Sequence, residues 1–205
     1  MMFGIDTVPT LDCAGRVLRL DRPQVMGIVN VTPDSFTDGG HHATAGAAIA
    51  HGLRLVEEGA DVLDVGGEST RPGAEPVDEA TEIARVLPVI EALVAKTAVP
   101  ISIDTTKPGV MRAALAAGAG MVNDVMALRM EGALEAVAAS KAAVVLMHMA
   151  GEPRTMQQAP SYDDVVGEVH RFLAERIFAC EMSGIDKRRI VIDPGFGFGK
   201  SLDHN

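Results

Sequence analysis

Short apolar runs alternate along this chain with longer segments in which apolar residues recur every three or four positions. The short runs are typical of buried strands, and the longer segments are typical of helices that bury one face. Strands are expected at residues 25–31, 61–67, 99–105, 121–125, 143–149 and 189–193. Helices are expected at residues 44–58, 78–97, 108–117, 131–139 and 162–183. A small hairpin is expected before them, at residues 11–21, and Pro88 should kink the second helix.

Strands that alternate with helices indicate a parallel sheet, which is either doubly wound or closed into a (β/α)8 barrel. The ends of the strands distinguish the two folds. A hydrogen-bonding side chain lies at or just after the end of every expected strand: Asn30, Glu68, Asp104, Asn123, Asp124, His148 and Asp193. An open sheet gathers its site at one switch point, whereas a barrel brings all its strand ends to one face. We therefore predict a single α/β domain over residues 1–205, a TIM barrel with about six of its eight βα units present.

The composition limits the partners of this domain. The chain has 205 residues, of which 47% are hydrophobic, and this is enough for one large core. Its net charge of −10 argues against nucleic acid as a partner. We see no signal peptide and no apolar stretch long enough to span a membrane. Cys13 and Cys180 are far apart in the sequence, so we expect free thiols in a cytoplasmic protein.

A glycine-rich loop, Asp193-Pro194-Gly195-Phe196-Gly197-Phe198-Gly199-Lys200, follows the sixth strand. Glycines at alternate positions let the backbone turn tightly and leave room for a flat ligand. A phosphate-binding P-loop would need a glycine at position 194, and a dinucleotide fingerprint would need one at position 200. Neither motif is present, so the loop indicates a site of another kind.

The chemistry of the strand ends favours a flat heterocycle. Asp104, Asn123 and Asp193 place two carboxylates and an amide in an apolar setting, which is costly unless a ligand pairs with them. An amino-pyrimidinone edge would do so, because its adjacent N–H groups match a carboxylate. His148 is either a core histidine or a functional one, and His41 and His42 are expected in an exposed loop. The long loops at residues 32–43 and 66–77 are candidate lids.

Six segments of the chain resemble, in order, the signatures of dihydropteroate synthase. The first two are long and specific, at residues 26–40 and 64–73. They are followed by residues 103–108, 122–124, 146–149 and 193–200. The resemblance implies a transferase of folate biosynthesis, the target of sulfonamides, built on a (β/α)8 barrel. Such an enzyme condenses 6-hydroxymethyl-7,8-dihydropterin diphosphate with 4-aminobenzoate and releases pyrophosphate.

The same resemblance implies roles for individual residues. The pterin would contact Asp104, Asn123, Met149, Asp193, Gly197 and Phe198. The aminobenzoate region would be lined by Thr70, Arg71, Pro72 and Phe198. Asn30 would contact Mg²⁺ bound to the diphosphate, and Asp34 would help to close the site. Asp34 and Asp104 are thus the catalytic candidates, and a homodimer is implied.

The family pattern continues for two further βα units beyond Asn205, so we expect this chain alone to be inactive. Two alternatives stay open at this stage. One is a pterin-dependent methyltransferase that acts on a corrinoid protein, and the other is an inactive fragment that binds a partner.

Overall fold

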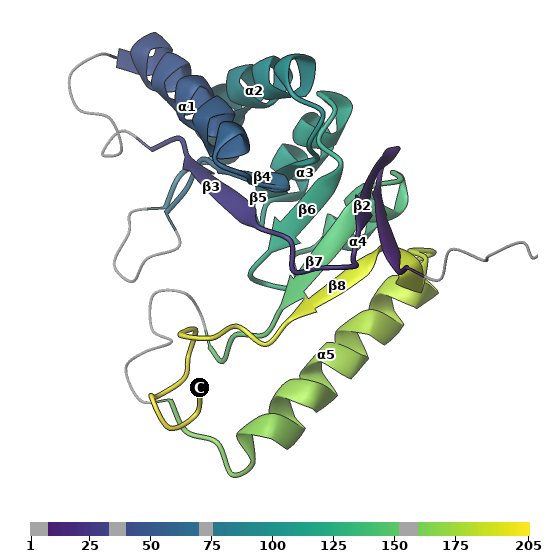
Figure 1. Cartoon of the computed structure of the whole chain (residues 1–205). Helices are drawn as coiled ribbons and strands as arrows, with labels where there is room; N and C mark the ends of the chain where they lie inside the picture. Colours follow the sequence, from purple (N-terminus) through teal and green to yellow (C-terminus); the bar gives the residue numbers. More distant parts are fainter. Residues whose placement is uncertain (1–7, 33–39, 70–75, 152–159) are drawn as a thin grey trace, which may run out of the picture.

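The structure is a computed structural model that describes residues 8–32, 40–69, 76–151 and 160–205, without the side chains of residues 40–44. The predicted hairpin is present as two antiparallel strands, β1 (Thr10–Cys13) and β2 (Arg16–Arg19). Its turn is made by Ala14 and Gly15, which both have positive φ, of 55° and 97°. The hairpin forms a two-stranded sheet of its own, and Figure 1 shows it close to β7 (Ala143–Met147) and β8 (Ile190–Asp193) of the main sheet.

The main sheet has six parallel strands, and their order in the sheet is their order in the chain. They are β3 (Met26–Asn30), β4 (Val62–Gly66), β5 (Ile101–Asp104), β6 (Met121–Asp124), β7 (Ala143–Met147) and β8 (Ile190–Asp193). A doubly wound sheet reverses its strand order at a switch point, and no reversal occurs in the described part of the chain. This unbroken order confirms the prediction of six barrel-type units. Within the described residues β3 and β8 are the two edges of the sheet, so the barrel is not closed.

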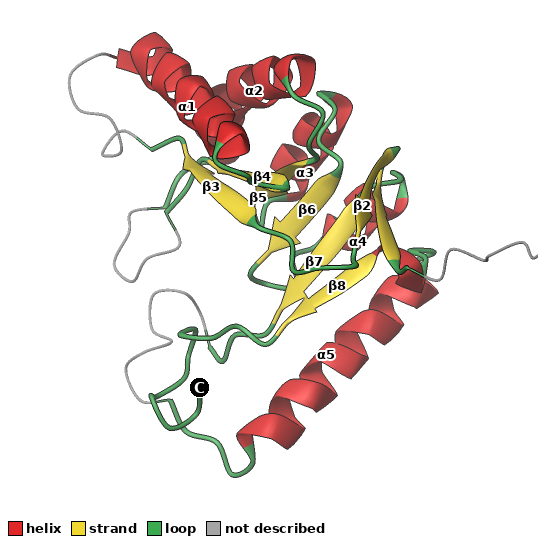
Figure 2. Ribbon diagram, viewed as in Figure 1, coloured by secondary structure: helices red, strands yellow, loops and turns green. Residues whose placement is uncertain are grey.

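Within the described residues, five α-helices connect these strands and cover the outer face of the curved sheet (Figure 2). They are α1 (Gly40–Glu57), α2 (Glu79–Lys96), α3 (Pro108–Ala116), α4 (Ala133–Ala138) and α5 (Val165–Met182). A short 3₁₀ helix, η2 (Lys187–Arg189), leads into β8. None of the described helices is long and apolar enough to cross a lipid bilayer.

Successive residues of each strand face opposite sides of the sheet, which creates an outer and an inner layer. Leu63, Val65, Ile101 and Ile103 face outward and pack with the helices in the main core. The inner layer is covered at the start of the strands by the hairpin. There Val62, Met121, Ala143 and Val145 pack against Leu11, Cys13 and Leu18. The hairpin therefore fills the amino-terminal end of the inner face and leaves the carboxyl-terminal end to polar residues.

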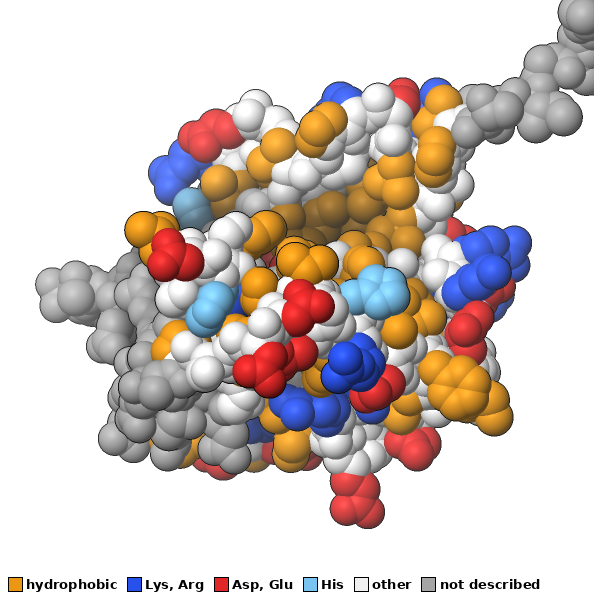
Figure 3. Space-filling view, turned by 90° about the horizontal axis from the view of Figure 1, so that it is seen from below, with side chains coloured by type: hydrophobic (Ala, Val, Ile, Leu, Met, Phe, Trp, Pro, Cys, Tyr) orange, Lys and Arg blue, Asp and Glu red, His pale blue; other side chains and the backbone are white. Residues whose placement is uncertain are grey.

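The edges of the sheet expose apolar side chains. Val25, Ile28 and Ile192 are each about half exposed, at 56%, 50% and 52%. The space-filling view from below shows hydrophobic side chains lining a hollow (Figure 3).

Buried Cys13 and Cys180 are free thiols, as predicted.

The predicted starts of α1, α4 and α5 were wrong. Helix boundaries depend on capping, which the apolar period does not reveal. Helix α1 begins at Gly40, so His41 and His42 lie in its first turn and not in a loop. The alanine-rich sequence there favours helix, and no residue marks a clear start. Helix α5 begins at Val165, after Asp164 accepts a hydrogen bond from the Gly167 N–H. Helix α4 is also shorter than the predicted residues 131–139, whereas α2 includes Pro88 and ends at Lys96, within one residue of the predicted bounds.

Candidate functional site

A row of four residues crosses the carboxyl end of the sheet at one level. Asn30 of β3 pairs with Gly66 of β4, Gly66 pairs with Asp104 of β5, and Asp104 pairs with Asn123 of β6. Paired residues of neighbouring strands face the same side of a sheet, and the strands lie about 4.8 Å apart. The side chains of Asn30, Asp104 and Asn123 are therefore neighbours on the inner face, as the strand-end pattern predicted.

Gly66 leaves room inside this row. A Cβ atom at Gly66 would lie 3.5 Å from Oδ2 of Asp104 and 3.9 Å from Oδ1 of Asn30. Its φ is not positive, so the backbone conformation does not require glycine here. The missing side chain lets the amide oxygen of Asn30 and the carboxylate of Asp104 approach one another from the two flanking strands.

Asp64 lies one layer beneath the row, and the sequence analysis did not select it. It is 3% exposed, and its Oδ2 accepts a hydrogen bond from Asn123 Nδ2 at 2.9 Å. Its other oxygen is buried without a hydrogen-bond partner among the described residues. The available signal was a charged residue in the middle of a strand that is otherwise apolar and completely buried. Asp64 fixes the amide of Asn123 and adds a second acid beside Asp104.

Burial governs the ionisation of these acids. It raises the pKa of Asp104 well above the ordinary value, and the negative charge of Asp64 raises it further. Burial also raises the pKa of Asp64. A ligand that donates hydrogen bonds to these carboxylates would favour their ionised form, so the centre is suited to a ligand rich in N–H donors.

Asp193 shares the inner face with this row but sits nearer the loop. Its strand β8 is separated from β6 by β7, and its register partner in β7 is Met147. Its Oδ1 accepts a hydrogen bond from the Gly195 N–H at 2.7 Å, which fixes the carboxylate at the start of the glycine loop. The structure thus places Asp193 on the predicted side of the sheet, beside the loop and not in the row itself.

An apolar cluster lies next to Asp193. Met149 and Phe198, two predicted ligand contacts, pack in it with Val125, Met126 and Met147. Gly197 has a φ of 79°, and a Cβ atom there would meet nothing within 4 Å. Glycine at this position is required by backbone conformation, and its N–H donates to Oδ1 of Asn205.

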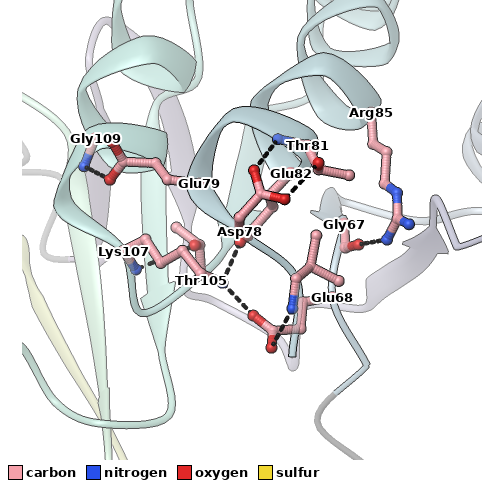
Figure 4. Close-up of polar contacts among 11 residues, drawn as sticks. Gly67, Glu68, Asp78, Glu79, Thr81, Glu82, Arg85, Thr105, Lys107 and Gly109 are labelled. Atoms are coloured by element: carbon pink, nitrogen blue, oxygen red, sulfur yellow. Dashed lines mark hydrogen bonds and ion pairs between the residues drawn. The ribbon is translucent and has the colours of Figure 1, made fainter. Parts of the chain in front are cut away.

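Glu68, which follows β4, is held by an ion-pair network (Figure 4). The ammonium of Lys107 contacts a carboxylate oxygen of Glu68 and lies 2.6 Å from Oε2 of Glu82. Glu82 is fully buried on α2. The other oxygen of Glu68 accepts from the Val77 N–H at 3.3 Å, and Arg85 donates to the carbonyl of Gly67 at 2.9 Å. These contacts join the start and the end of the β4–α2 connection to the body of the sheet.

Asp124 and His148 have structural contacts. Both carboxylate oxygens of Asp124 accept backbone N–H bonds, from Met126 and Leu128, so this acid shapes the turn after β6. His148 is buried, and its Nδ1 lies 3.0 Å from the ammonium of Lys200. Four predicted site residues lie outside the described residues: Asp34, Thr70, Arg71 and Pro72.

Comparisons with known proteins agree with this geometry. The model of the family described as pterin binding enzyme matches residues 26–205. Dihydropteroate synthase of Escherichia coli (strain K12) is 52% identical over 191 residues, which cover 93% of this chain and 68% of that protein. Dihydropteroate synthase of Neisseria meningitidis serogroup B is 53% identical over 198 residues, with 94% and 69% covered.

Solved structures give the same result. Xanthomonas albilineans dihydropteroate synthase with 4-aminobenzoic acid superposes with a TM-score of 0.90 at 70% identity, over 97% of this chain and 71% of that chain. The Xanthomonas enzyme in complex with 7,8-dihydropteroate gives a TM-score of 0.82 at 63% identity, over 96% and 68%. The Yersinia pestis enzyme with a sulfonamide drug complex gives 0.90 at 49% identity, over 96% and 71%. All these proteins carry the name of the synthase, which favours it over the corrinoid methyltransferase.

Proposed function

The chain belongs to the dihydropteroate synthase family of pterin-binding enzymes, and we propose that its strand-end row is the pterin subsite. The family reaction condenses 6-hydroxymethyl-7,8-dihydropterin diphosphate with 4-aminobenzoate to 7,8-dihydropteroate and pyrophosphate, in folate biosynthesis. The observation that carries the proposal is the register that aligns Asn30, Gly66, Asp104 and Asn123 at one level.

The pterin edge suits the charges of this row. Asp104, Asn123 and Asp193 offer acceptors and an amide donor to an amino-pyrimidinone, whose adjacent N–H groups pair with carboxylates. Met149 and Phe198 supply an apolar surface for the flat ring, because they pack in one cluster next to Asp193. The bare backbone of Gly197 fits the close approach of such a ring.

We assign the second substrate to the neighbouring loops. Phe198, together with Thr70, Arg71 and Pro72, would line the aminobenzoate region, and Asp34 would help to close the site. The Xanthomonas structures with 4-aminobenzoic acid and with 7,8-dihydropteroate support both small-molecule partners. In the reaction the bond between the pterin methylene carbon and the diphosphate oxygen breaks, and pyrophosphate leaves with the bonding electrons. The aromatic amine then attacks the methylene cation and loses a proton.

Asn30 is the residue we propose for Mg²⁺. Its Oδ1 and Oδ2 of Asp104 flank the space above Gly66. The described residues contain no group of three or more His, Cys, Asp or Glu that could hold a metal. Mg²⁺ needs few protein ligands, because it keeps several waters and binds substrate phosphates, so a single amide oxygen fits. When bound, the ion would neutralise charge on the leaving diphosphate.

A cytoplasmic homodimer completes the proposal. The two free, buried thiols support a reducing compartment. Sedimentation of the chain would test the dimer.

Calorimetric titration with 6-hydroxymethylpterin, which carries the pterin edge, tests the pterin subsite. Asp104→Asn should weaken binding by at least about tenfold, since a hydrogen bond to a charged group contributes about 1.5–3 kcal/mol. Glu91→Gln is the matched control, because it also removes one carboxylate but lies exposed on α2. Equal affinity of wild type and both variants would place the pterin elsewhere.

A further inference from the structure

Lys200 is a buried cation at the end of the glycine loop, and it is not among the proposed pterin contacts. Lys200 is only 6% exposed. The ammonium donates to the carbonyl oxygens of Gly195 at 3.0 Å and Phe198 at 3.1 Å, and it lies 3.0 Å from Nδ1 of His148. None of the salt bridges among the described residues includes Lys200. A buried charge without an ion-pair partner is costly, and burial lowers the pKa of Lys200 while the more distant charge of Asp193 raises it, so these neutral acceptors have to hold the ammonium in place.

The loop is folded around this ammonium. The Phe198 N–H donates to the Gly195 carbonyl at 3.0 Å, and the Tyr162 hydroxyl donates to the Gly199 carbonyl at 2.7 Å. A Cβ atom at Gly195 would lie 2.0 Å from the carbonyl oxygen of His148. The loop is therefore pressed against the segment that follows β7, and Lys200 ties the two together.

We propose that Lys200 is a positioning residue, which holds the glycine loop and with it Asp193 and Phe198 in place for the pterin, and that neutral His148 is an essential acceptor in this clamp. Gly195 connects the clamp to the ligand side, since its N–H donates to Asp193 while its carbonyl accepts from Lys200. The proposal rests on the pterin subsite described above, but the clamp itself can be tested without a ligand.

The role of His148 follows from its chemistry. An ammonium has donors and no acceptor, so Nδ1 of His148 must be the acceptor and the ring proton must sit on Nε2. Protonation would turn Nδ1 into a donor and would place a second cation beside Lys200. Burial lowers the pKa of His148, and the charges of Lys200 and Arg129 lower it further, while a hydrogen bond to its own backbone and the charge of Glu168 raise it.

Among the described residues, two aromatic side chains also contact this ring. Phe172 of α5 meets the ring edge-on at 5.0 Å between centroids, and Tyr162 lies at 6.1 Å. Because the pKa of His148 is lower in the folded state than its ordinary value of about 6.5, the clamp is intact above that pH. It weakens as the pH falls through the folded-state pKa.

Three variants separate the clamp from general stability. Lys200→Met removes the ammonium, and Lys141→Met is the matched control, because Lys141 is exposed in the turn before β7. His148→Asn keeps an acceptor near the position of Nδ1 but cannot be protonated. The measurements are the affinity for 6-hydroxymethylpterin by calorimetry and the hydrogen exchange of the Gly195 and Phe198 amides, with the Val122 amide of β6 as the internal reference.

Lys200→Met should weaken pterin binding at least tenfold and speed exchange of the loop amides at least tenfold, with Val122 unchanged. Lys141→Met should behave as wild type. Between pH 7.5 and pH 5, wild type should lose protection of the loop amides relative to His148→Asn measured at the same pH. Normal affinity and loop protection in Lys200→Met would overturn the proposal, and so would exchange that rises equally at Val122. Identical pH profiles of wild type and His148→Asn would overturn the part played by His148. If wild type binds no pterin but the loop amides respond as expected, the clamp stands and the pterin subsite falls.

Discussion

Replacement of Lys107 by methionine should strongly destabilise the fold. Glu82 is fully buried, its Oε2 lies 2.6 Å from the Lys107 ammonium, and its Oε1 has no hydrogen-bond partner among the described residues. Lys107→Met would leave this carboxylate buried and unpaired, and removal of one partner of a buried pair costs about 3–5 kcal/mol. For a domain of this size each 1 kcal/mol changes the melting temperature by about 2–4 °C, so the expected loss is about 6–20 °C.

Urea unfolding followed by circular dichroism would measure this free energy. Arg22→Met is the matched control. It removes the ion pair with Asp61, and the Arg22 side chain is 60% exposed. That change should leave the free energy of unfolding close to the wild-type value, because exposed ion pairs are screened by solvent. Adding Glu82→Met to Lys107→Met should restore most of the loss, since removal of both charges of a buried pair is often close to neutral. A cost below about 1 kcal/mol for Lys107→Met alone would refute the reasoning.

Other changes test the remaining parts of the site. Asp193→Asn should weaken binding of 6-hydroxymethylpterin in calorimetry by about 1.5–3 kcal/mol, the contribution of one charge-assisted bond, and unchanged affinity would contradict its role. Gly197→Ala should cost about 1–2 kcal/mol of unfolding free energy, because only the positive φ of 79° opposes it. Gly195→Ala should cost clearly more in the same urea titration, because its Cβ would also overlap the His148 carbonyl oxygen at 2.0 Å, and equal costs would show that the loop simply moves away. Burial raises the pKa of Asp124 to about 6, so the folded state holds this proton more tightly than the unfolded state does. As the pH rises from about 4 to 6, wild type should therefore lose up to about 3 kcal/mol relative to Asp124→Asn, and parallel stability curves would contradict the raised pKa.

The sheet and the strand-end row could be predicted because each depends on a short stretch of sequence. An apolar run followed by a polar residue defines a strand and its end, and parallel pairing then brings the ends together. Asp104 and Asn123 were found in this way. Asp64 was not, because a carboxylate in the middle of a buried run does not reveal which neighbour it contacts. Its partner Asn123 is 59 positions away in the sequence.

The contacts of Lys107 and Lys200 could not be predicted from the sequence for the same reason. Lys107 meets Glu82 across 25 positions, and Lys200 meets His148 across 52. Most lysines in proteins are exposed. Lys107 is partly buried because α2 packs against the sheet, and Lys200 is buried because the glycine loop packs against the end of β7. The predicted start of α1 was wrong on a smaller scale, because the apolar period that indicated the helix does not extend back to Gly40.

Acids outnumber cations at the strand ends, so the proposed pterin subsite has a negative electrostatic field. Within the described part of the site, Asp64, Asp104, Glu68 and Glu82 all contribute to the field, and Lys107 compensates two of them. Burial makes the ionised form of Asp104 costly in the free protein. A pterin would offset that cost through its N–H donors, and the ionised acids would then stabilise the positive charge that spreads into the pterin ring as pyrophosphate leaves. Fixed negative charge of this kind stabilises a transition state because it needs no reorganisation during the reaction. An amide in place of Asp104 would weaken the hydrogen bonds to the pterin edge, and it would also remove that field.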